Sequence, residues 1–280
     1  MGIDKNKSLF SHTIKKETMR ILFILFLFLP TLVFSQLNQT DVNGLRQGKW
    51  EKKQANGRLI YEGQFKDGKP VGEWKRYHTG GQIKAEIVYV GDTARTVLLD
   101  VWRKKVASGN YINQKKEGVW SIYKNREKVA DEEYKDGVKN GIARKFYDTR
   151  QIMEQCEWKN GKQDGDYEVF YKSGKPYIQC KMKENVRNGL FLIYFENGQQ
   201  ELVGEYKNNL RHNEWKYHNK KGENMYSLFY DNGQILNPNV RDSIGNIEMQ
   251  NFEKNKGAIT DPEKFMEDPS GYMMKNKPKQ

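Results

Sequence analysis

Short apolar segments separated by glycine-containing turns fill most of the chain. In 166–171 (DYEVFY) and 190–195 (LFLIYF) bulky residues follow a glycine, and a turn such as ENGQ at 196–199 leads into a second extended segment. Asn-Gly and Asp-Gly pairs, which tolerate the positive φ of tight hairpin turns, recur between the segments. No stretch of 43–233 keeps a 3.6-residue apolar period with helix caps. The pattern therefore predicts a succession of β-hairpins.

The hairpins repeat in register, and one residue, called the marker here, stands at the same point of each unit. The markers are Gly48, Gly72, Gly118, Gly141, Gly165 and Gly189, with Asn213 completing the series. They are 24, 46, 23, 24, 24 and 24 residues apart, so one degenerate unit, at about 92–111, lies inside the 46-residue step. Two residues after the markers stand Trp50, Trp74, Trp120, Ala143, Tyr167, Phe191 and Trp215. The units end on Phe65, Tyr89, Tyr111, Tyr134, Trp158, Met182, Tyr206 and Phe229.

Eight such units fit between residues 43 and 233, and each contributes two strands. Sixteen strands about 4.8 Å apart would form a sheet roughly 75 Å long. Because open sheets of more than about ten strands curl or split, strong twist or curvature is expected. The predicted fold is all-β: an elongated, twisted antiparallel β-meander in which each unit touches chiefly its neighbours. The degenerate unit, which lacks a marker glycine, is expected to bulge or bend the array.

Alternation along the second strand of each unit separates a buried side from a polar one. Ala85, Ile87 and Tyr89 share one side, as do their counterparts in later units, while the intervening positions are mostly polar. One face of the sheet is therefore predicted to be apolar and the other solvated, as antiparallel meanders allow. Rings in the first strands fall on both faces, so some of them should stay half-exposed.

Both cysteines occupy the same repeat position, two residues before the end of a unit. Cys156 precedes Trp158 and Cys180 precedes Met182. Equivalent strands of adjacent units are separated by one strand, or about 9–10 Å, whereas a disulfide needs Cα atoms within about 7 Å. Two unpaired, packed thiols are therefore predicted. The counterparts in other units are Gly63, Gly109, Gly204 and Ser227, which suggests a slot for small side chains.

The first 35 residues have the pattern of a secretory signal peptide. Residues 21–34 form an apolar run, Lys15, Lys16 and Arg20 precede it, and the small residue Ser35 follows it. Cleavage after Ser35 would make Gln36 the first mature residue. Because a transmembrane helix needs about 20 apolar residues, an uncleaved membrane anchor is the alternative. Residues 1–18 can be an over-called start, with Met19 the true one. The leader predicts export to the periplasm, cell envelope or medium.

The predicted organisation is a leader at 1–35, a repeat domain at 43–235 and a tail at 236–280. The tail is polar, contains four prolines and carries equal numbers of acidic and basic side chains. It is expected to be flexible or loosely docked, with a short helix around 261–268.

Composition bounds the class of protein and the kinds of partner. The chain of 280 residues has a mean hydropathy of −0.92, yet its 6 Trp, 16 Tyr and 13 Phe argue against wholesale disorder. Its formal net charge is +12, to which residues 1–35 contribute five basic and two acidic side chains, so residues 36–280 carry +9. That excess favours an anionic partner, with a solvated basic surface as the alternative. Nucleic acid is not expected as a partner of an exported chain.

Several stretches resemble one known family of repeats. GEWKRYHTGG at 72–81, GVWSIY at 118–123, GDYEVFYKSG at 165–174 and GLFLIYFENG at 189–198 are similar to the MORN-repeat variant family. The likeness covers about 43–233, and the degenerate unit and Ala143 depart from it. The resemblance implies an elongated stack of β-hairpins with a binding or scaffolding role, and phospholipid contact for such repeats generally. Some variants are antitoxin components of toxin–antitoxin pairs, which fits an exported chain poorly.

No residues stand at spacings that predict catalysis or a cofactor. His78, His212 and His218 lack Cys or acidic neighbours at metal-ligand spacing, so ordinary histidines are expected and no metal site. Glu132 and Glu154 fall on the apolar face by register; either burial raises their pKa, or they pair with nearby Lys or Arg. No catalytic constellation, cofactor site or small-molecule substrate is predicted.

The first functional hypothesis is an exported, non-catalytic scaffold that binds another protein of the cell envelope. Exposed aromatic residues beside cations are typical of protein contacts. The candidate binding surface is Trp74, Tyr77, Trp120, Tyr123, Phe170, Tyr194 and Trp215, although core packing is the competing role for each Trp. The alternatives are recognition of an anionic membrane lipid or glycan by the basic repeats, and neutralisation of a toxin as an antitoxin-like partner.

Overall fold

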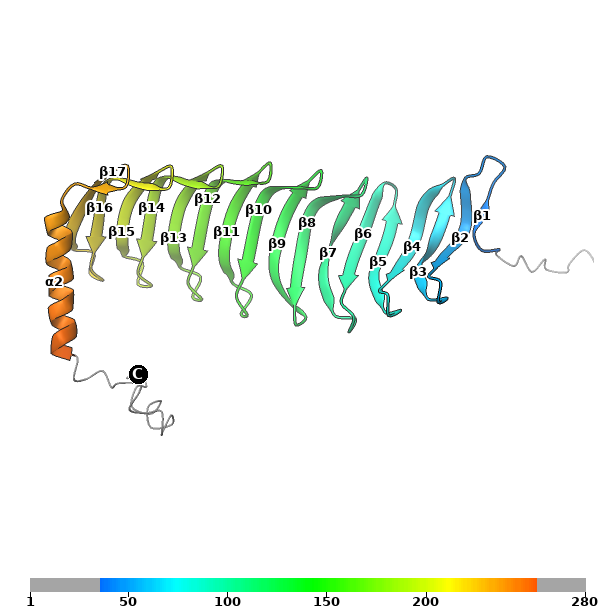
Figure 1. Cartoon of the computed structure of the whole chain (residues 1–280), viewed down its shortest axis with the longest axis horizontal. Helices are drawn as coiled ribbons and strands as arrows, with labels where there is room; N and C mark the ends of the chain where they lie inside the picture. Colours follow the sequence, from blue (N-terminus) through cyan, green and yellow to red (C-terminus); the bar gives the residue numbers. More distant parts are fainter. Residues whose placement is uncertain (1–35, 256–280) are drawn as a thin grey trace, which may run out of the picture.

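A single long antiparallel sheet makes up the repeat region (Figure 1). The computed structural model describes residues 36–255, and the predicted leader and the short helix expected around 261–268 lie outside the described residues. Sixteen long strands, two for each predicted unit, form the sheet, with a two-residue strand at either end. Each strand pairs with the next one in the chain, so the all-β meander is confirmed.

In chain order the strands are β1 (Gln39–Thr40), β2 (Arg46–Lys53), β3 (Leu59–Lys66), β4 (Lys69–Tyr77), β5 (Ile83–Val90), β6 (Thr93–Leu99), β7 (Lys105–Ile112), β8 (Lys115–Lys124), β9 (Glu127–Lys135), β10 (Val138–Phe146), β11 (Ile152–Lys159), β12 (Lys162–Phe170), β13 (Pro176–Lys183), β14 (Val186–Tyr194), β15 (Gln200–Lys207), β16 (Leu210–His218), β17 (Asn224–Asp231) and β18 (Gln234–Ile235). The chain then enters α2 (Pro238–Asn255), which projects from the end of the sheet (Figure 1).

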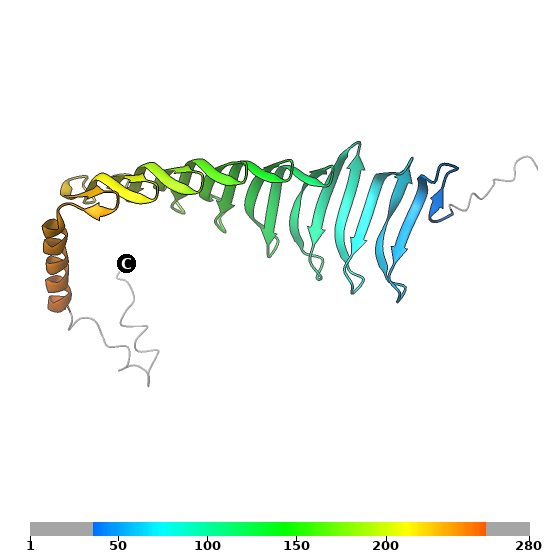
Figure 2. The same ribbon diagram turned by 45° about the horizontal axis from the view of Figure 1, so that its top comes forward.

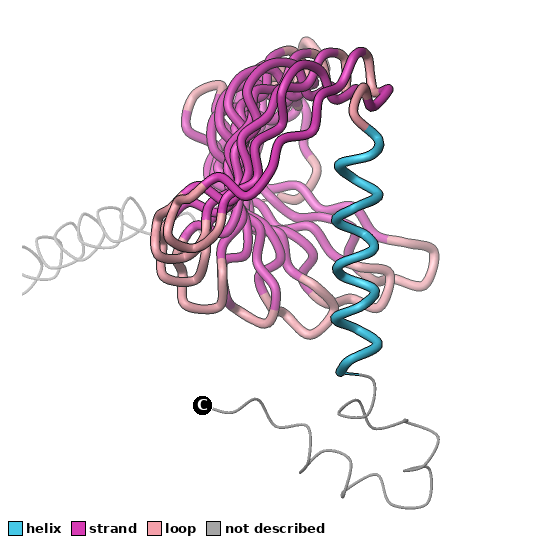
Figure 3. Tube along the Cα trace, turned by 90° about the vertical axis from the view of Figure 1, so that its left-hand side faces the viewer, coloured by secondary structure: helices cyan, strands magenta, loops and turns pink. Residues whose placement is uncertain are grey.

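The sheet twists along its length, as single-layer antiparallel sheets do. In Figure 2 the strands of the N-terminal half are seen face-on while those of the C-terminal half are seen nearly edge-on, and the view along the array in Figure 3 shows the strands fanning about its axis. Turns of two kinds alternate at the two edges. Between most units the turns have two central residues with positive φ, as at Asp67-Gly68; within most units a single residue has positive φ, as at Gly57.

The marker residues are the points at which each first strand departs from regular extension. All six marker glycines have positive φ, and so does Asn213 at 60°. Beside the marker the pairing with the preceding strand shifts: Gln64 pairs with Val71 and Glu62 with Lys75, so β4 carries extra residues opposite Gly63. The bulge gives the ring two residues after the marker room to lie over the preceding strand.

Each such ring lies over a residue of the preceding unit that matches it in size. A Cβ added at Gly63, Gly109 or Gly204 would overlap the ring of Trp74, Trp120 or Trp215, respectively. Where the residue two positions after the marker is smaller than tryptophan, the residue beneath it is larger than glycine. Cys156 pairs with Tyr167, Cys180 pairs with Phe191, and Glu132 pairs with Ala143. The slot for small side chains inferred from sequence is therefore the space beneath the next unit's ring.

Rings join neighbouring units on one side, called the aromatic face here; the other side is the polar face. Phe65 packs edge-on against Trp74, with ring centroids 4.8 Å apart, and Trp74 packs against Tyr89. At the other end Trp215 has no exposed surface and lies between Tyr206 and Tyr230. Two apolar clusters result, one in the first three units and one in the last three.

The register corrects the expected end of the eighth unit by one residue. Marker residues pair with the ring that ends their own unit, as Gly189 does with Tyr206, and Asn213 pairs with Tyr230. The ring that ends the unit is therefore Tyr230; Phe229 lies on the polar face and is exposed. The slot position likewise holds buried Leu228 and not Ser227. A shift of one residue exchanges the faces, because strand side chains alternate.

The degenerate unit, β6 and β7, continues the sheet without a positive-φ residue in β6. Its pairing with β5 is regular from Ala85–Leu98 to Val90–Thr93, so the expected bulge is missing at this boundary. Thr96 takes the ring position and is buried against Ile87 across the strand. Here two mid-sized residues replace the combination of a large ring and a glycine.

Both ends of the sheet are closed by an asparagine side chain. At the N-terminal edge Asn38 Oδ1 accepts the backbone N–H of Glu51. At the C-terminal edge Asn237 accepts the N–H of Phe229 and donates to the carbonyl of Ser227. Because unpaired edge groups template pairing with other chains, these caps blunt the ends of the array. Helix α2, which sequence reasoning assigned to a flexible or loosely docked tail, begins directly after the second cap.

Cys156 and Cys180 are free and buried, as predicted. Tyr167 of the intervening strand pairs with both of them, so one strand separates the two thiols. Burial above all, with nearby Glu154, raises the pKa of Cys156 to about 11. Both thiols therefore serve as small apolar residues beneath neighbouring rings.

Size matching beneath the rings predicts a specific rescue. Gly204→Cys should lower the free energy of unfolding by about 1–3 kcal/mol, because the new side chain would collide with buried Trp215. Trp215→Phe alone should cost about 2 kcal/mol through lost packing. Combined, the two changes recreate the Cys180–Phe191 arrangement and should cost less than the sum of the single changes. Denaturant unfolding of the four proteins measures this coupling, and additive losses would refute the size rule.

The marker conformation predicts different tolerances at two glycines. Gly118 has a φ of 66° and open space where a Cβ would lie, and Asn213 already occupies this conformation in the eighth unit. Gly118→Asn should therefore cost no more than about 1 kcal/mol. Gly165 has a φ of 128°, which L-residues avoid, and an added Cβ would meet the Glu157 side chain. Gly165→Asn should cost about 2–3 kcal/mol. Equal unfolding midpoints for the two variants would contradict the argument.

Candidate functional site

A basic residue recurs two positions before the marker, and its charged group lies over the rings of its own unit. These residues are Arg46, Lys116, Lys139, Arg187 and Arg211. They lie on the aromatic face, since Lys116 pairs across the strand with Tyr111, and Arg211 with Tyr206. The corresponding positions of adjacent units are about 10 Å apart, or two strand spacings. The array therefore carries a row of positive charge along the edge where the turns between units lie.

Arg211 shows the arrangement most completely. Its guanidinium carbon is 4.4 Å from the centroid of Trp215 and 5.3 Å from that of Tyr230. One guanidinium nitrogen also donates to the Tyr230 hydroxyl at 2.9 Å. A cation over an aromatic face contributes about 0.5–1 kcal/mol when exposed and about 2 kcal/mol when desolvated. The half-buried Arg211 thus stabilises the ring that closes the last unit.

The other cations repeat this geometry with their own rings. The Arg46 guanidinium carbon is 4.9 Å from the centroids of both Trp50 and Phe65. The Lys116 amine is 4.7 Å from Trp120 and 4.5 Å from Tyr134. Arg187 and Lys139 lie over rings in the same way. A single-layer sheet leaves the outer side of such rings open to solvent, and these aliphatic stems and cations cover it.

Charge is distributed unequally between the two faces. The cations that the strand register places on the aromatic face are Arg46, Lys52, Arg76, Lys116, Lys139, Lys145, Arg187 and Arg211. The carboxylates on the same face among the described strands are Glu132 and Glu154, and each is held by a lysine. The aromatic face therefore keeps a clear positive excess.

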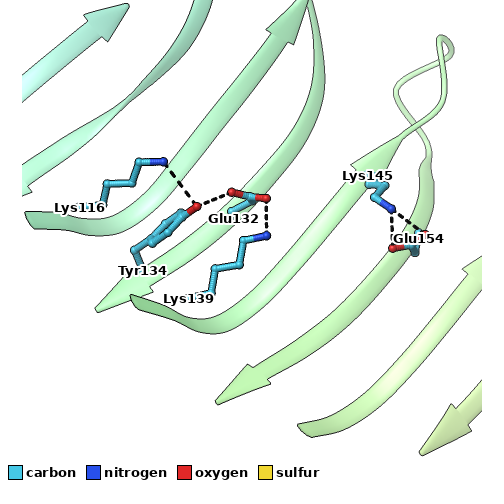
Figure 4. Close-up of polar contacts among 6 residues, drawn as sticks. All are labelled: Lys116, Glu132, Tyr134, Lys139, Lys145 and Glu154. Atoms are coloured by element: carbon cyan, nitrogen blue, oxygen red, sulfur yellow. Dashed lines mark hydrogen bonds and ion pairs between the residues drawn. The ribbon is translucent and has the colours of Figure 1, made fainter. Parts of the chain in front are cut away.

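The pairing alternative for Glu132 and Glu154 is the one that the structure supports (Figure 4). Glu132 lies 2.6 Å from the Lys139 amine and accepts the Tyr134 hydroxyl at 2.6 Å. Burial is the largest influence and acts to raise the pKa of Glu132, but the hydrogen bonds from Lys139 and Tyr134 with the nearby lysine charges outweigh it and lower the pKa. Glu154 lies 2.9 Å from Lys145. These pairs occupy the middle of the array, where Ala143 replaces a ring.

The polar face carries both signs of charge in alternation. Ion pairs there join Lys75 to Glu62 and Lys128 to Asp131, at 3.8 and 2.6 Å. Lys181 pairs with Asp166. Mixed charges of this kind largely cancel at a distance, so the polar face attracts an anion less than the aromatic face does.

The seven residues of the predicted binding surface fall into two rows on opposite faces. Trp74, Trp120 and Trp215 are almost completely buried in the aromatic face, so of the two roles weighed for them they take core packing. Tyr77, Tyr123, Phe170 and Tyr194 all stand five residues after a marker, and the strand alternation places them on the polar face near the turns within units. The structure thus separates the tryptophans from the other four.

The four residues on the polar face are half-buried by polar neighbours. Tyr77 donates its hydroxyl to Glu62 at 2.6 Å, and burial together with this hydrogen bond raises the pKa of Tyr77 to about 12. Tyr194 donates to the Gln179 side chain at 2.9 Å. The Lys105 amine lies 4.1 Å from the centroid of Tyr123. These rings cover the polar face near one edge and are held by contacts within the chain.

Sequence reasoning missed the cations over the rings, although their signal is visible once the register is known. A basic residue two positions before the marker recurs in the same register as the glycines themselves. Trp102 was also missed. It lies in the turn of the degenerate unit and is 77% exposed, and its signal is a tryptophan at a turn position where other units have polar residues or glycine.

The histidines contact single neighbours rather than a cluster of possible ligands. Within residues 36–255 no group of three or more His, Cys, Asp or Glu side chains could hold a metal ion. The nitrogen Nε2 of His78 lies 3.1 Å from the Leu99 carbonyl, and Nδ1 of His212 lies 3.6 Å from Asp231. The described part of the chain has no helix long and apolar enough to span a bilayer.

Comparison with known proteins identifies the repeats. Residues 70–90 and 163–184 match the family model described as MORN repeat variant, and a search of curated proteins finds no match. Two crystal structures align with 45% of this chain: TarM, at 14% identity, and an S. aureus TarM mutant in complex with Fondaparinux, alpha-GlcNAc-glycerol and UDP, at 15%. Their TM-scores are 0.23 and 0.21, and the chain covers about a fifth of their length (21% and 22%).

The two matched stretches coincide with whole structural units. Residues 70–90 span β4 and β5, and residues 163–184 span β12 and β13. The units between and around them share the same strand pairing, and most share the positive-φ marker. Two of the eight units therefore match MORN repeat variants, and the other units repeat their strand pairing.

Proposed function

We propose that this chain is an exported, non-catalytic scaffold that binds another protein of the cell envelope through its aromatic face. Repeats of this family are in general modules that bind proteins or lipids. The observation that carries the proposal is the one-sided row of cations over aromatic rings, opposite a face of mixed charge. Such a surface fits an acidic, elongated contact on a partner.

The cations retain binding capacity while they cover the rings. Arg46 and Arg187 are exposed, and a guanidinium has five donors, of which Arg187 uses one on the Tyr206 hydroxyl. The remaining donors can meet carboxylates of a partner without leaving the ring. Tyr, Trp and Arg are also the residues that contribute most to protein interfaces.

Export is supported by the leader pattern at 1–35, in which a basic flank, a short apolar run and a small residue follow one another. A scaffold role without catalysis is supported by the buried, neutral thiols and by carboxylates that are paired with lysines. An enzyme needs convergent polar groups in a sheltered site, and the rows of this sheet are linear.

A second candidate is recognition of an anionic membrane lipid or glycan by the same face. The recurrence of equivalent cations in five of the eight units, about 10 Å apart where the units are adjacent, favours it, because a surface with repeated negative charge presents several partners at once. The two candidate functions differ in the partner, a protein or an anionic lipid or glycan, and both use the same cations of the aromatic face.

Retention of an envelope protein tests the first candidate. Residues 36–280 as bait should retain a protein from a solubilised envelope fraction, and Arg187→Gln with Arg211→Gln should greatly reduce its yield because cations of the aromatic face are lost. Lys159→Gln with Lys207→Gln, which removes equal charge from the polar face, should leave the yield unchanged. Thermal unfolding of each bait checks its fold. Equal retention by both double variants would contradict the assignment.

Vesicle sedimentation tests the second candidate. Binding of residues 36–280 to phosphatidylglycerol vesicles should exceed binding to phosphatidylcholine and weaken as salt rises. Loss of Arg187 and Arg211 should weaken it about 30-fold, at about 1 kcal/mol per cation near an anionic surface. No binding to phosphatidylglycerol at low salt would rule out the lipid candidate.

A further inference from the structure

The third unit, β6 and β7, exposes apolar side chains where the other units expose polar ones. Its turn, Asp100–Lys104, presents Val101 and Trp102, which are 45% and 77% exposed. The corresponding turns of neighbouring units present sequences such as Thr79–Gly81 and Asp148–Arg150. A large exposed tryptophan in an ordered turn is uncommon in a protein that has no contact to make with it.

The turn that carries Trp102 is held rigidly. The Asp100 carboxylate accepts the backbone N–H of Trp102 at 3.0 Å and that of Lys104 at 2.7 Å. The backbones of Asp100 and Lys104 are also paired, and Arg103 takes the positive φ that closes the turn. The tryptophan is therefore presented on a pre-organised loop, which lowers the entropy that a contact would cost.

The polar face of the same region also carries exposed apolar side chains. Val88 and Val90 on β5, Ile112 on β7 and Val119 on β8 are exposed. Thr93 pairs with both Val90 and Ile112, which places these two side chains on neighbouring positions of one face. Val88 precedes Val90 by two residues on β5 and therefore lies on the same face, opposite Arg95. The turn that carries Val101 and Trp102 lies at the other edge of the sheet from the turns that follow Val90 and Ile112. We call the whole set, which spans the width of the sheet, the third-repeat patch.

The charges around the third-repeat patch identify its occupant. Among the apolar side chains on the strands, carboxylates of Glu86 and Glu117 alternate with the cations Arg95 and Lys115, which pair with Val88 and Ile112. A protein partner can match both signs of charge, whereas an anionic bilayer presents only one. A second copy is disfavoured because residues 36–280 carry a net charge of +9. Arg103 and Lys104 flank Trp102, which favours carboxylates near the tryptophan in whatever binds it.

We propose that the third-repeat patch docks a protein partner, with Trp102 inserted into an apolar pocket of that partner whose rim carries carboxylates. The inference rests on the proposed scaffold role and adds a second contact on the face opposite the cation row. One tryptophan buries about 150–250 Å², whereas a standard interface needs about 800 Å² on each side, so the valines and Ile112 must take part.

Site-specific photo-crosslinking tests the docking surface in cells that make the full chain. A benzophenone amino acid replaces Trp102 or Val119 within the patch. Two matched positions serve as controls. Thr149 stands at the turn position equivalent to Trp102, and Leu190 follows its marker directly, as Val119 does, with the same exposure of 52%. Protein adducts are expected from positions 102 and 119 and not from 149 and 190.

Each other outcome has a distinct meaning. No adduct from 102 or 119, adducts with lipid only, or adducts only with a second copy would overturn the docking proposal. Protein adducts from 149 or 190 alone would overturn it and leave the scaffold role standing. If no position yields a protein adduct and the envelope bait retains no protein, both proposals fail.

The crosslinked protein, once identified and purified, allows a quantitative test. Trp102→Ser should weaken its binding to residues 36–280 about 30-fold, the effect of an interface hot spot, and Val119→Ser about fivefold. Leu190→Ser should leave binding unchanged. All three side chains are largely exposed, so thermal unfolding should be unaffected. Equal binding by Trp102→Ser and the unsubstituted chain would overturn the role of the tryptophan.

Discussion

The structure depends on one packing relation: in most units a ring in the first strand lies over a small residue of the strand before it. The relation needs two local departures from regular sheet, a positive-φ marker and extra residues opposite the slot, as at Gly72 beside Gly63. Without the bulge the ring would stand beside its neighbour; with it, Trp215 reaches complete burial in a sheet of a single layer. The burial that a second layer usually provides is obtained between adjacent units.

Ring burial between units also explains why charge gathers on the same face. A row of rings on a single sheet has an outer side that no other layer covers. Long basic side chains cover it and gain cation–π attraction, as Arg211 does over Trp215 at 4.4 Å. An acidic side chain would gain nothing from the ring face, whose partial charge is negative. Positive charge accumulates on the aromatic face as a consequence of packing, and a surface able to attract anions results.

Period and alternation in the sequence predicted the number of long strands, their pairing order and the apolar side, because glycine spacing and two-residue alternation are local signals. The end of the eighth unit was placed at Phe229 because a bulky residue stood near the expected step, whereas the register that pairs Asn213 with Tyr230 is a relation between strands. The seven predicted contact residues fell on two faces for a related reason. Residues two and five positions after a marker alternate in direction, and the sequence alone did not show that tryptophan burial needs a glycine opposite.

The third unit lacks the packing relation and differs from its neighbours in burial and in exposed surface. With no positive-φ residue in β6, its pairing with β5 is regular, and Thr96 opposite Ile87 fills the space that a ring and a glycine fill elsewhere. Two mid-sized side chains bury less area than a tryptophan, so this unit draws less stability from its neighbours. It nevertheless exposes Val101, Trp102 and Ile112, which lowers solubility without improving packing. This unit buries less core area and exposes more apolar area than its neighbours, and a contact that covers the exposed area explains both features. Random substitution at exposed positions explains them less simply, because it introduces polar residues at least as often as apolar ones.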